Sequence, residues 1–566
     1  MPARLLRATL AVAFLAAPEA RATEVDWSAE GYYRARAYTI RNLANETSEP
    51  IPKVSFLTQR VRLEPRLALF EIASLQLTAD LLDDVVWGDN NAEAVAPLFA
   101  GNPGNTNLLG QETDTVALKR AWIEFTVPVG LVRVGRMPSH WGLGLLSNGG
   151  GTSGCKNGCP DPFFDDDFGD NHFGSVYDRI LFATRPIQVG RTLAGSKDPG
   201  SNFILAYAYD KLVEDYFNIP LERQLRIDAD ASGNAPPPGT QRGEGESLFL
   251  ADADDDVRQH VLVLAYDNPD WNARRRETDE LRGGVYIVRR SQPKSRLVCD
   301  PATLETNPGD CGDAGAGPND LVFVGDGSVI YVWDFWWRVR WRWIYGESEF
   351  YWILGHTDGG VPIGTTESQS KTAHIFGGAW RLGYASARTD ATFEVGRASG
   401  DDDVGDRRFT QRPLHPDYNV GLLLYEEVLR EFSARKLGRL PALDGRIAES
   451  RSLQSWGGVI NSRYLFPRVK VRPIQRLELI GGLLLAWVDR KGFEFPERDE
   501  DGREYGNFLG WEIDGGVGWR WAEGHLRFTL EGAYLRFGDA LLRGNDRLRQ
   551  GVKSAGTVQS RIALVF

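Results

Sequence analysis

The sequence predicts an all-β protein whose strands close into a transmembrane antiparallel β-barrel, and three observations support this fold class. The first is strict two-residue alternation in the segment 331–345, YVWDFWWRVRWRWIY, whose odd positions are all apolar or aromatic. The second is an N-terminal leader with no spanning helix after it, and the third is a regular alternation of short and long links between strands. Only a strand places successive side chains on opposite faces, and a wall between lipid and water needs Trp and Tyr at its interfaces.

The opposite face of the same segment carries charge. Its even positions include Asp334, Arg338, Arg340 and Arg342. A soluble sandwich also hides one apolar face, but it rarely needs so many aromatic residues on a single strand. We therefore expect one strand over 328–345, with its odd face toward lipid and a tight turn at Gly346.

The N-terminus indicates export. Arg4 and Arg7 precede an apolar run over 10–17, and the small-x-small site Ala20-Arg21-Ala22 predicts cleavage before Thr23. The run is too short to span a bilayer. We expect a signal peptide over residues 1–22 and a single transmembrane β-barrel domain over 23–566.

Composition argues against helical membrane spans. After the leader, no segment has eighteen uninterrupted apolar residues, and the mean hydropathy is −0.33. The chain nevertheless contains 62 Gly and 17 Trp. An exported chain of this kind is expected in a bacterial outer membrane.

Strands are expected wherever period-two stretches are bounded by turn residues. There are about eighteen, and sixteen or twenty stay open because a missed or invented pair preserves the parity of the links. The expected ranges are 26–41, 53–70, 73–87, 116–127, 129–137, 174–186, 202–211, 257–268, 279–291, 328–345, 347–357, 370–385, 386–399, 452–467, 468–487, 508–521, 525–537 and 554–566.

The links between these strands predict the orientation of the barrel. Links after even-numbered strands are mostly very short, for example Pro128-Val129-Gly130, whereas links after odd-numbered strands are longer. Outer-membrane barrels pair short periplasmic turns with longer extracellular loops. Both termini are therefore expected in the periplasm, although the even links 187–201 and 269–278 are longer than this rule prefers.

The face of each strand opposite the apolar one should line the pore, because the two-residue period fixes the register. This face is mixed in sign and rich in arginine. The expected pore-lining residues are Arg34, Arg36, Arg60, Arg62, Glu64, Arg66, Arg120, Glu124, Arg338, Arg340, Arg342, Arg388, Asp390, Arg520 and Arg527.

Two interpretations of these arginines stay open. In one, Arg and Glu on facing strands simply pair across the wall, as in any charged lumen. In the other, they form an electropositive track that favours anionic solutes and grips carboxylates in a forked geometry. Phosphate and polyuronate would both suit that chemistry.

The acidic charge gathers in loop-like runs. The formal net charge is −12, so nucleic acid is not an expected partner of the outer surface, because phosphate binding needs clustered basic charge. No cofactor is expected. Acidic runs supply hard oxygen ligands for calcium, although neither run has EF-hand spacing and solvated acidic loops are common. The candidate ligands are Asp165, Asp166, Asp167, Asp170, Asp252, Asp254, Asp255 and Asp256.

Four cysteines fit an oxidising compartment. Cys155 and Cys159 are close in sequence, as are Cys299 and Cys311. Of the three possible connectivities we prefer the two local bridges as loop staples. A metal site at the Cys-x3-Cys pair is a weaker alternative.

The long loop 400–451 contains an apolar and charged run of about helical length, 420–437. This run either folds inward as a constriction or caps the pore from outside. An equally simple interpretation extends Tyr418 to Tyr425 as a strand beyond the membrane.

The last strand carries a resemblance to known proteins. Positions 558, 562, 564 and 566 are apolar and the chain ends at Phe566. This resembles outer-membrane porins, and the resemblance implies that the barrel-assembly machinery reads the final strand. The segment Val134 to Gly142 also looks like the Gly-Arg strand end of many porins.

Two further resemblances concern function. The strand number and the arginine-rich interior are similar to alginate-export-type channels, which implies passage of an acidic polysaccharide. The segments Trp141-Gly142-Leu143-Gly144-Leu145-Leu146 and His415-Pro416-Asp417-Tyr418-Asn419-Val420-Gly421 look like a predicted outer-membrane family of no assigned activity. Individual conduit residues of the alginate family are not matched here.

The expected function is an outer-membrane channel for small or polymeric hydrophilic solutes, biased to anions. The expected partners are outer-membrane lipid, lipopolysaccharide, the assembly machinery and an anionic solute. The alternative from another class is a surface adhesin or scaffold barrel with a plugged lumen. An outer-membrane hydrolase, using His140 or His172 beside Asp165 and Asp170, is a weaker alternative without a motif, so no enzyme activity is expected.

Overall fold

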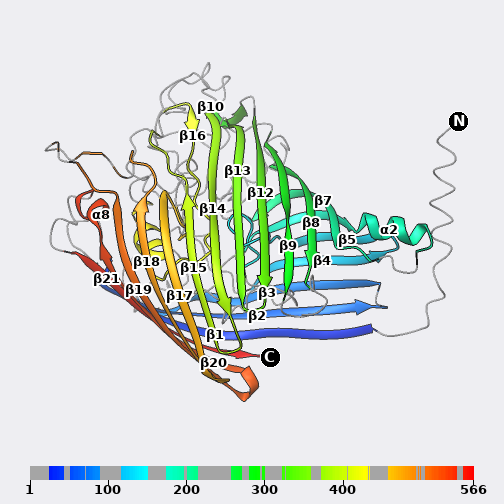
Figure 1. The fold of residues 1–566 in the computed structure, drawn as a ribbon, viewed down its shortest axis with the longest axis horizontal. Helices are drawn as coiled ribbons and strands as arrows, with labels where there is room; N and C mark the ends of the chain where they lie inside the picture. The colour runs from blue at the N-terminus through cyan, green and yellow to red at the C-terminus, as the bar shows by residue number, and fades with distance from the viewer. Residues whose placement is uncertain are drawn as a thin grey trace.

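The computed structural model describes residues 25–43, 51–70, 72–88, 116–150, 174–196, 200–214, 257–269, 279–292, 296–299, 321–324, 327–357, 371–403, 406–430, 432–433, 455, 457–492, 495, 497–498, 502, 504–544 and 552–566. Within these ranges the molecule is a closed antiparallel β-barrel (Figure 1). Each barrel strand pairs with the next along the chain, and the first pairs with the last, so the barrel has no free edge.

Eighteen strands form the wall, as the sequence predicts. They are β1 (Val25–Leu43), β2 (Ile51–Leu69), β3 (Ala73–Gly88), β4 (Val116–Val127), β5 (Gly130–Pro138), β6 (Val176–Thr184), β7 (Phe203–Glu214), β8 (Arg258–Asn268), β9 (Glu280–Gln292), β12 (Ser328–Trp341), β13 (Ile344–Thr357), β14 (Lys371–Ala385), β15 (Thr389–Ala398), β17 (Ser462–Ile474), β18 (Leu477–Val488), β19 (Phe508–Trp521), β20 (Leu526–Phe537) and β21 (Ser554–Val565).

Smaller elements lie in the links. On the extracellular side these are the pair β10 (Arg296–Cys299) and β11 (Leu321–Val324), the short β16 (Arg408–Phe409), the π-helical turn η3 (Leu424–Leu429) and the helix α8 (Asp539–Gly544). On the periplasmic side they are the helix α2 (Pro186–Leu193) and the 3₁₀ turn η5 (Ala522–Gly524). The helix α2 accounts for the unusual length of the link after β6.

The predicted strand boundaries are wrong by more than three residues in two places. The expected strand 328–345 ends at Trp341, and a two-residue turn at Arg342 and Trp343 leads into β13. Trp341 pairs with Ile344, so the outward face moves from odd to even positions across this turn. The sequence pattern does not reveal this turn. Trp343 lies in the turn and Tyr345 points inward, but both are aromatic and so continue the alternation.

The second error concerns β17 and β18. The sequence placed their boundary near residue 468, whereas the structure places the turn at 475–476. Residues 457–461 precede β17 and are buried inside the barrel. Because these residues are buried, their apolar composition resembles that of a strand, although they do not belong to the barrel wall.

The outer surface carries an apolar and aromatic belt. Trp333, Trp337, Trp352, Phe376 and Trp380 are all more than a third exposed, while their sequence neighbours point inward and are more buried. Such a surface is stable only against lipid. Among the described residues, no helix has the length and hydropathy needed to cross a bilayer. The protein is an integral outer-membrane barrel.

The extracellular half of the lumen contains a hydrophobic core. Inward-facing wall residues such as Ile353, Ile375 and Leu484 pack in one buried cluster with Leu422 and Leu424 of the loop after β15. The loop therefore folds into the barrel. The alternative strand from Tyr418 to Tyr425 is not formed, because this stretch has turn and π-helical backbone.

Candidate functional site: the charged lumen

The candidate site is a group of arginines on the inner face of five neighbouring strands, in which β21, β1, β2 and β4 contribute arginines and β3 contributes Asp80. Six guanidinium side chains here are only 2–5% exposed: Arg34, Arg36, Arg60, Arg62, Arg120 and Arg561. Among the described buried residues of these strands, Asp80 is the only carboxylate. We call these six residues the arginine wall.

Asp80 is bound mainly by one member of the wall. Arg62 donates from Nε and Nη2 to the two carboxylate oxygens at 2.7 and 2.8 Å, in a forked geometry. Arg60 Nε lies 3.9 Å from the same carboxylate. One negative charge is therefore shared between two guanidinium groups.

Other members of the wall donate to neutral oxygens. Arg120 Nη2 donates to the carbonyl oxygen of Gly149 at 2.7 Å, and Arg36 Nη2 donates to Gln559 Oε1. Arg561 Nη2 donates to Thr529 Oγ1 at 3.3 Å. Neutral acceptors satisfy hydrogen-bonding geometry without cancelling charge. Among the described buried residues of these five strands, arginines outnumber carboxylates six to one.

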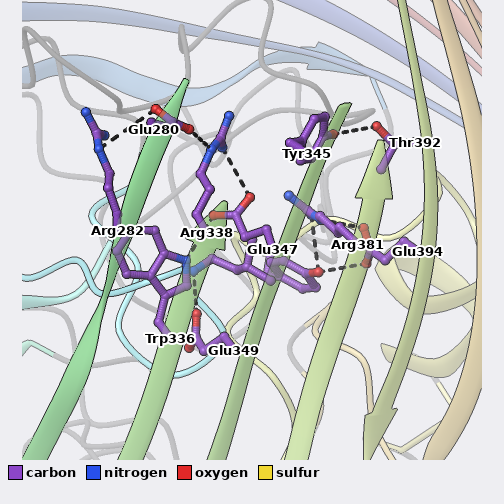
Figure 2. Close-up of polar contacts among 12 residues, drawn as sticks. Glu280, Arg282, Trp336, Arg338, Tyr345, Glu347, Glu349, Arg381, Thr392 and Glu394 are labelled. Atoms are coloured by element: carbon purple, nitrogen blue, oxygen red, sulfur yellow. Dashed lines mark hydrogen bonds and ion pairs between the residues drawn. The ribbon is translucent and has the colours of Figure 1, made fainter. Parts of the chain in front are cut away.

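The wall from β9 to β13 differs, because its Arg338 contacts two acids (Figure 2). Arg338 donates from Nε to Glu280 and from Nη1 to Glu347, the latter at 3.2 Å. Trp336 Nε1 also donates to Glu347, at 2.9 Å. The prediction of mutual pairing describes Arg338 better than the prediction of an anion track.

A second polar cluster, with one carboxylate and two arginines, surrounds Glu394 on β15. This fully buried carboxylate accepts from Arg381 Nε at 2.7 Å and from Arg468 Nη2 at 2.8 Å. The hydroxyls of Tyr418 and Tyr464 donate to its other oxygen at 2.7 and 2.6 Å. Because Tyr418 belongs to the inward-folded loop, the cluster also ties that loop to the wall.

Two further glutamates hold inward-folded backbone. Glu512 on β19 accepts from the backbone N–H groups of Leu422, Leu423 and Leu424, at 2.7, 2.8 and 2.7 Å. Glu349 on β13 accepts in the same way from Leu143, Gly144 and Leu145. Each carboxylate caps a turn that contains glycine at positive φ, Gly421 in one and Gly144 in the other.

The two inward-folded segments, which are residues 141–150 (the first) and 414–429 (the second, or inward loop), contact each other. The backbone N–H of His415 donates to Leu145 O at 2.7 Å, and Asn148 Nδ2 donates to Asp417 O at 3.2 Å. These contacts join the segments 141–148 and 415–421. Their shared role is thus to fill the extracellular half of the barrel.

The remaining predicted pore residues lie nearer the periplasmic end. Glu124 accepts from Arg133 Nε at 2.7 Å, and Asp390 Oδ2 accepts from Arg472 Nη1 at 2.6 Å. Arg527 Nε donates to Gly524 O at 2.8 Å. Glu64, Arg66 and Arg520 are partly or fully exposed members of the inner face.

Arg340, Arg342 and Arg388 do not form a ladder with Arg338. Arg340 Nε donates to the carbonyl of Arg342 at 3.0 Å. Arg342 occupies the β12–β13 turn with φ of 57° and lies over the Trp341 ring. Arg388 is exposed in the link before β15. The strand face expected at Arg342 and Arg388 is wrong because both fall in turns.

Sequence reasoning missed several lumen residues. Arg561 alternates with the apolar positions of the last strand, so its inward direction was available from the register alone. The pair Arg179 and Asp210, joined at 2.7 Å through both carboxylate oxygens, lies on strands with the same alternation. Nothing in the sequence indicated that Asp80 pairs with Arg62 across β2 and β3.

A buried Ser-His-Asp set lies where the inward segments meet, but its hydrogen bonds do not suit catalysis. His415 Nε2 lies 3.1 Å from Ser175 Oγ, and Asp417 Oδ2 lies 4.0 Å from Nδ1. Nδ1 accepts the backbone N–H of Asp417, which leaves the ring proton of a neutral imidazole on Nε2. A general base would need Nε2 free to accept the serine proton. Ser175 is also fully buried.

Some predictions fall outside the described residues. These are the signal peptide, the side chains of all four cysteines, His172, and the acidic runs that begin at Asp165 and Asp252. In the part of the chain that the structure describes, no group of three or more His, Cys, Asp or Glu could hold a metal ion. His140 is described, and its Nδ1 accepts the backbone N–H of Gly149 at 3.1 Å.

Comparison with known proteins gives only distant similarities. No family model matches this chain, and no curated protein matches it. Among solved structures it is similar to OccK9 (OpdG) of Pseudomonas aeruginosa, with 10% identity, coverage of 96% of this chain and 99% of that one, and a TM-score of 0.45. A BenF-like porin from Pseudomonas fluorescens Pf-5 has 9% identity, coverage of 96% and 98%, and a TM-score of 0.43.

A third example is OccK11 (OpdR) of Pseudomonas aeruginosa, with 10% identity, coverage of 95% and 96%, and a TM-score of 0.42. Similarities this distant indicate neither a solute nor a mechanism. The resemblance to alginate-export-type channels is not shown by any of them.

Proposed function

We propose that this protein is an outer-membrane channel that passes small anionic solutes along the arginine wall. The observation that carries the proposal is the excess of buried positive charge on one side of the lumen, six guanidiniums against Asp80. Positively charged linings attract anions and exclude cations. Arginine also binds carboxylate and phosphate in a forked geometry, so both anion classes are suitable solutes.

Small solutes suit this lumen better than an acidic polysaccharide does. The two inward-folded segments occupy the extracellular half, and leucines of the second segment, Leu422 to Leu424, are essentially fully buried there. A polymer would need both segments to leave. Small anions need only a path beside them, along the strands from β21 to β4.

The test is ion selectivity of the purified protein in planar bilayers. Each guanidinium removed from contact with an anion costs about 1 kcal/mol of attraction, or roughly fivefold in relative permeability. The double substitution Arg34→Gln with Arg36→Gln should therefore lower the chloride-to-potassium permeability ratio severalfold. The matched control is Arg136→Gln, because Arg136 also pairs across neighbouring strands but lies on the outer face beside Asp178.

The control should leave the ratio unchanged. Equal ratios in the wild type and the double variant would refute a role of the arginine wall in selectivity.

A second candidate function is a scaffold barrel with a closed lumen. It is favoured by the hydrophobic core inside the barrel, where Leu414, Leu423 and Tyr425 are fully buried. The two functions differ in conductance. A protein that inserts into bilayers as a folded barrel but never opens, even at high voltage, would support the scaffold.

A further inference from the structure

An apolar groove lies on the outer surface of the barrel, at its periplasmic end, between the helix α2 and the wall. Its volume is about 410 Å³, within the roughly 300–1,000 Å³ range of small-molecule sites. No charged side chain lines it. The main lining residues are Ile187, Phe203, Leu205, Leu264, Tyr266 and Gly283.

The register places this groove on the lipid side. Phe203 and Leu264 are 51% and 46% exposed, whereas Ala206 on β7 and Val261 on β8 point inward and are buried. Gly283 contributes no side chain, and a Cβ there would lie 3.2 Å from the Cβ of Trp337. The glycine lets the neighbouring strand with Trp337 approach closely, and it adds no side chain to the groove.

The helix α2 forms the outer edge of the groove. It leaves the barrel wall sideways after β6 (Figure 1) and has no buried residue. Ile187 is 42% exposed and Leu193 is 82% exposed. A short helix with exposed apolar residues beside a lipid-facing wall lies in the membrane interface, here that of the inner leaflet.

A cation is fixed at the mouth of the groove. Arg191 follows Ile187 by four residues, so both lie on one face of α2. Its Nη1 donates to Gly200 O at 2.7 Å, and Gly200 is three residues before Phe203. The guanidinium is thereby held where β7 begins, at the level of lipid headgroups, and Arg185 at the start of the helix adds a second exposed cation.

We propose that this groove is a binding site for an anionic glycerophospholipid of the inner leaflet. One acyl chain lies in the groove between α2 and the strands β7, β8 and β9. The phosphate lies beside Arg191. The apolar lining explains the chain, and the charge at the mouth explains a preference for a net negative headgroup.

The experiment is native mass spectrometry of the full chain in detergent, titrated with dioleoyl phosphatidylglycerol or dioleoyl phosphatidylcholine. We expect saturable retention of one phosphatidylglycerol and at least tenfold weaker retention of phosphatidylcholine. Leu264→Trp fills the groove and should weaken phosphatidylglycerol binding at least tenfold. Leu262→Trp is the matched control, because Leu262 faces lipid on the same strand but does not line the groove.

The headgroup is tested by Arg191→Gln, which should bring phosphatidylglycerol down to the retention of phosphatidylcholine. Three outcomes would overturn the proposal: no saturable lipid, equal losses in the two tryptophan variants, or equal binding of both lipids by the wild type. Thermal unfolding of each variant in the same detergent confirms that the barrel has formed.

Discussion

At the scale of single residues, the arginine wall depends on how few carboxylates oppose it. Asp80 is 1% exposed and holds Arg62 in a forked pair, with Arg60 close to the same group. Removing one partner of a buried ion pair leaves the other charge uncompensated. Asp80 therefore lowers the positive potential of the wall while it stabilises the barrel.

We predict that Asp80→Asn raises the anion preference and destabilises the protein. The loss of a buried partner costs about 3–5 kcal/mol in the free energy of unfolding. Reversal potentials and urea unfolding in lipid vesicles measure the two effects. The control is Asp178→Asn, which breaks a pair on the outer face whose side chains are 32% and 44% exposed, and it should cost less than about 1 kcal/mol.

The inward loop carries a titratable group near this wall. Burial raises the pKa of the Glu426 carboxyl to about 8, and the positive charge of Arg430 opposes the rise. The folded pKa lies above the unfolded value, so the folded loop binds a proton more tightly than the unfolded chain. The stabilisation is complete below about pH 4.5 and is lost as the pH rises toward 8.

We predict that the inward loop becomes easier to open between pH 5 and pH 8. Hydrogen exchange of the amides of residues 418–429, corrected for the intrinsic pH dependence of exchange, measures this opening. Glu426→Gln should remove the pH dependence and protect the loop at pH 8. An unchanged slope in this variant would show that another group controls the opening.

The sequence predicted which residues face inward far better than which ones pair. Alternation places Arg34, Arg62 and Arg338 on the inner face alike, because the strand period decides direction. Whether an arginine meets Glu347, as Arg338 does, or a neutral amide, as Arg36 does, depends on the partner strand and its register. No local pattern encodes that contact.

At the scale of elements, the inward segments depend on single carboxylates of the wall. Glu512 accepts three backbone N–H groups at the turn before η3. Among the described residues, no other carboxylate accepts from these three N–H groups. A buried unsatisfied donor costs about 1–3 kcal/mol. The segment from Leu414 to Leu429 is therefore held mainly at this turn and at Glu394.

We predict that Glu512→Ala releases the second inward segment and raises single-channel conductance severalfold. Glu512→Gln keeps one acceptor oxygen and should have an intermediate effect. The control is Glu504→Ala, because Glu504 is an exposed residue of the extracellular rim. Identical conductance in all of these variants would show that the inward segment does not limit the current.

Strands were predictable from sequence, whereas the inward loop was not. Each strand shows the two-residue period and ends near turn residues, so all eighteen were located. The boundaries were wrong by more than three residues only around Arg342 and at β17 and β18. The described part of the run 420–437, residues 420–430 and 432–433, is apolar for a different reason, because it packs against the inner wall. Burial inside a barrel, a capping helix and an extended strand all require the same apolar composition.

The last residue, Phe566, is the subject of a prediction that has not been tested. Strand β21 ends at Val565, and Phe566 exchanges backbone hydrogen bonds with Gly31 at 2.9 and 3.0 Å. Its side chain is 50% exposed, as are its outward-facing neighbours on β21, Ile562 and Leu564, at 47% and 49%. Recognition of this residue by the barrel-assembly machinery stays a prediction.

At the scale of the whole molecule, the lumen is divided along its axis and across its width. The extracellular half is filled by the two inward segments, and the inner face nearer the periplasm is more exposed. Around the barrel, Glu349 on β13 and Glu512 on β19 accept backbone N–H groups, and Glu394 on β15 accepts from two arginines. Hydrogen bonds from neutral N–H groups do not cancel the charge of a carboxylate, so the excess of arginine is a property of the strands β21 to β4 and not of the whole lumen.

The central claim is that the lumen selects anions, and the reversal potential of the wild-type protein tests it most directly. Single channels are recorded in a planar bilayer with a tenfold gradient of potassium chloride. The account predicts a reversal potential whose sign shows chloride to be more permeant than potassium. A reversal potential of the opposite sign, or one at zero, would contradict the account.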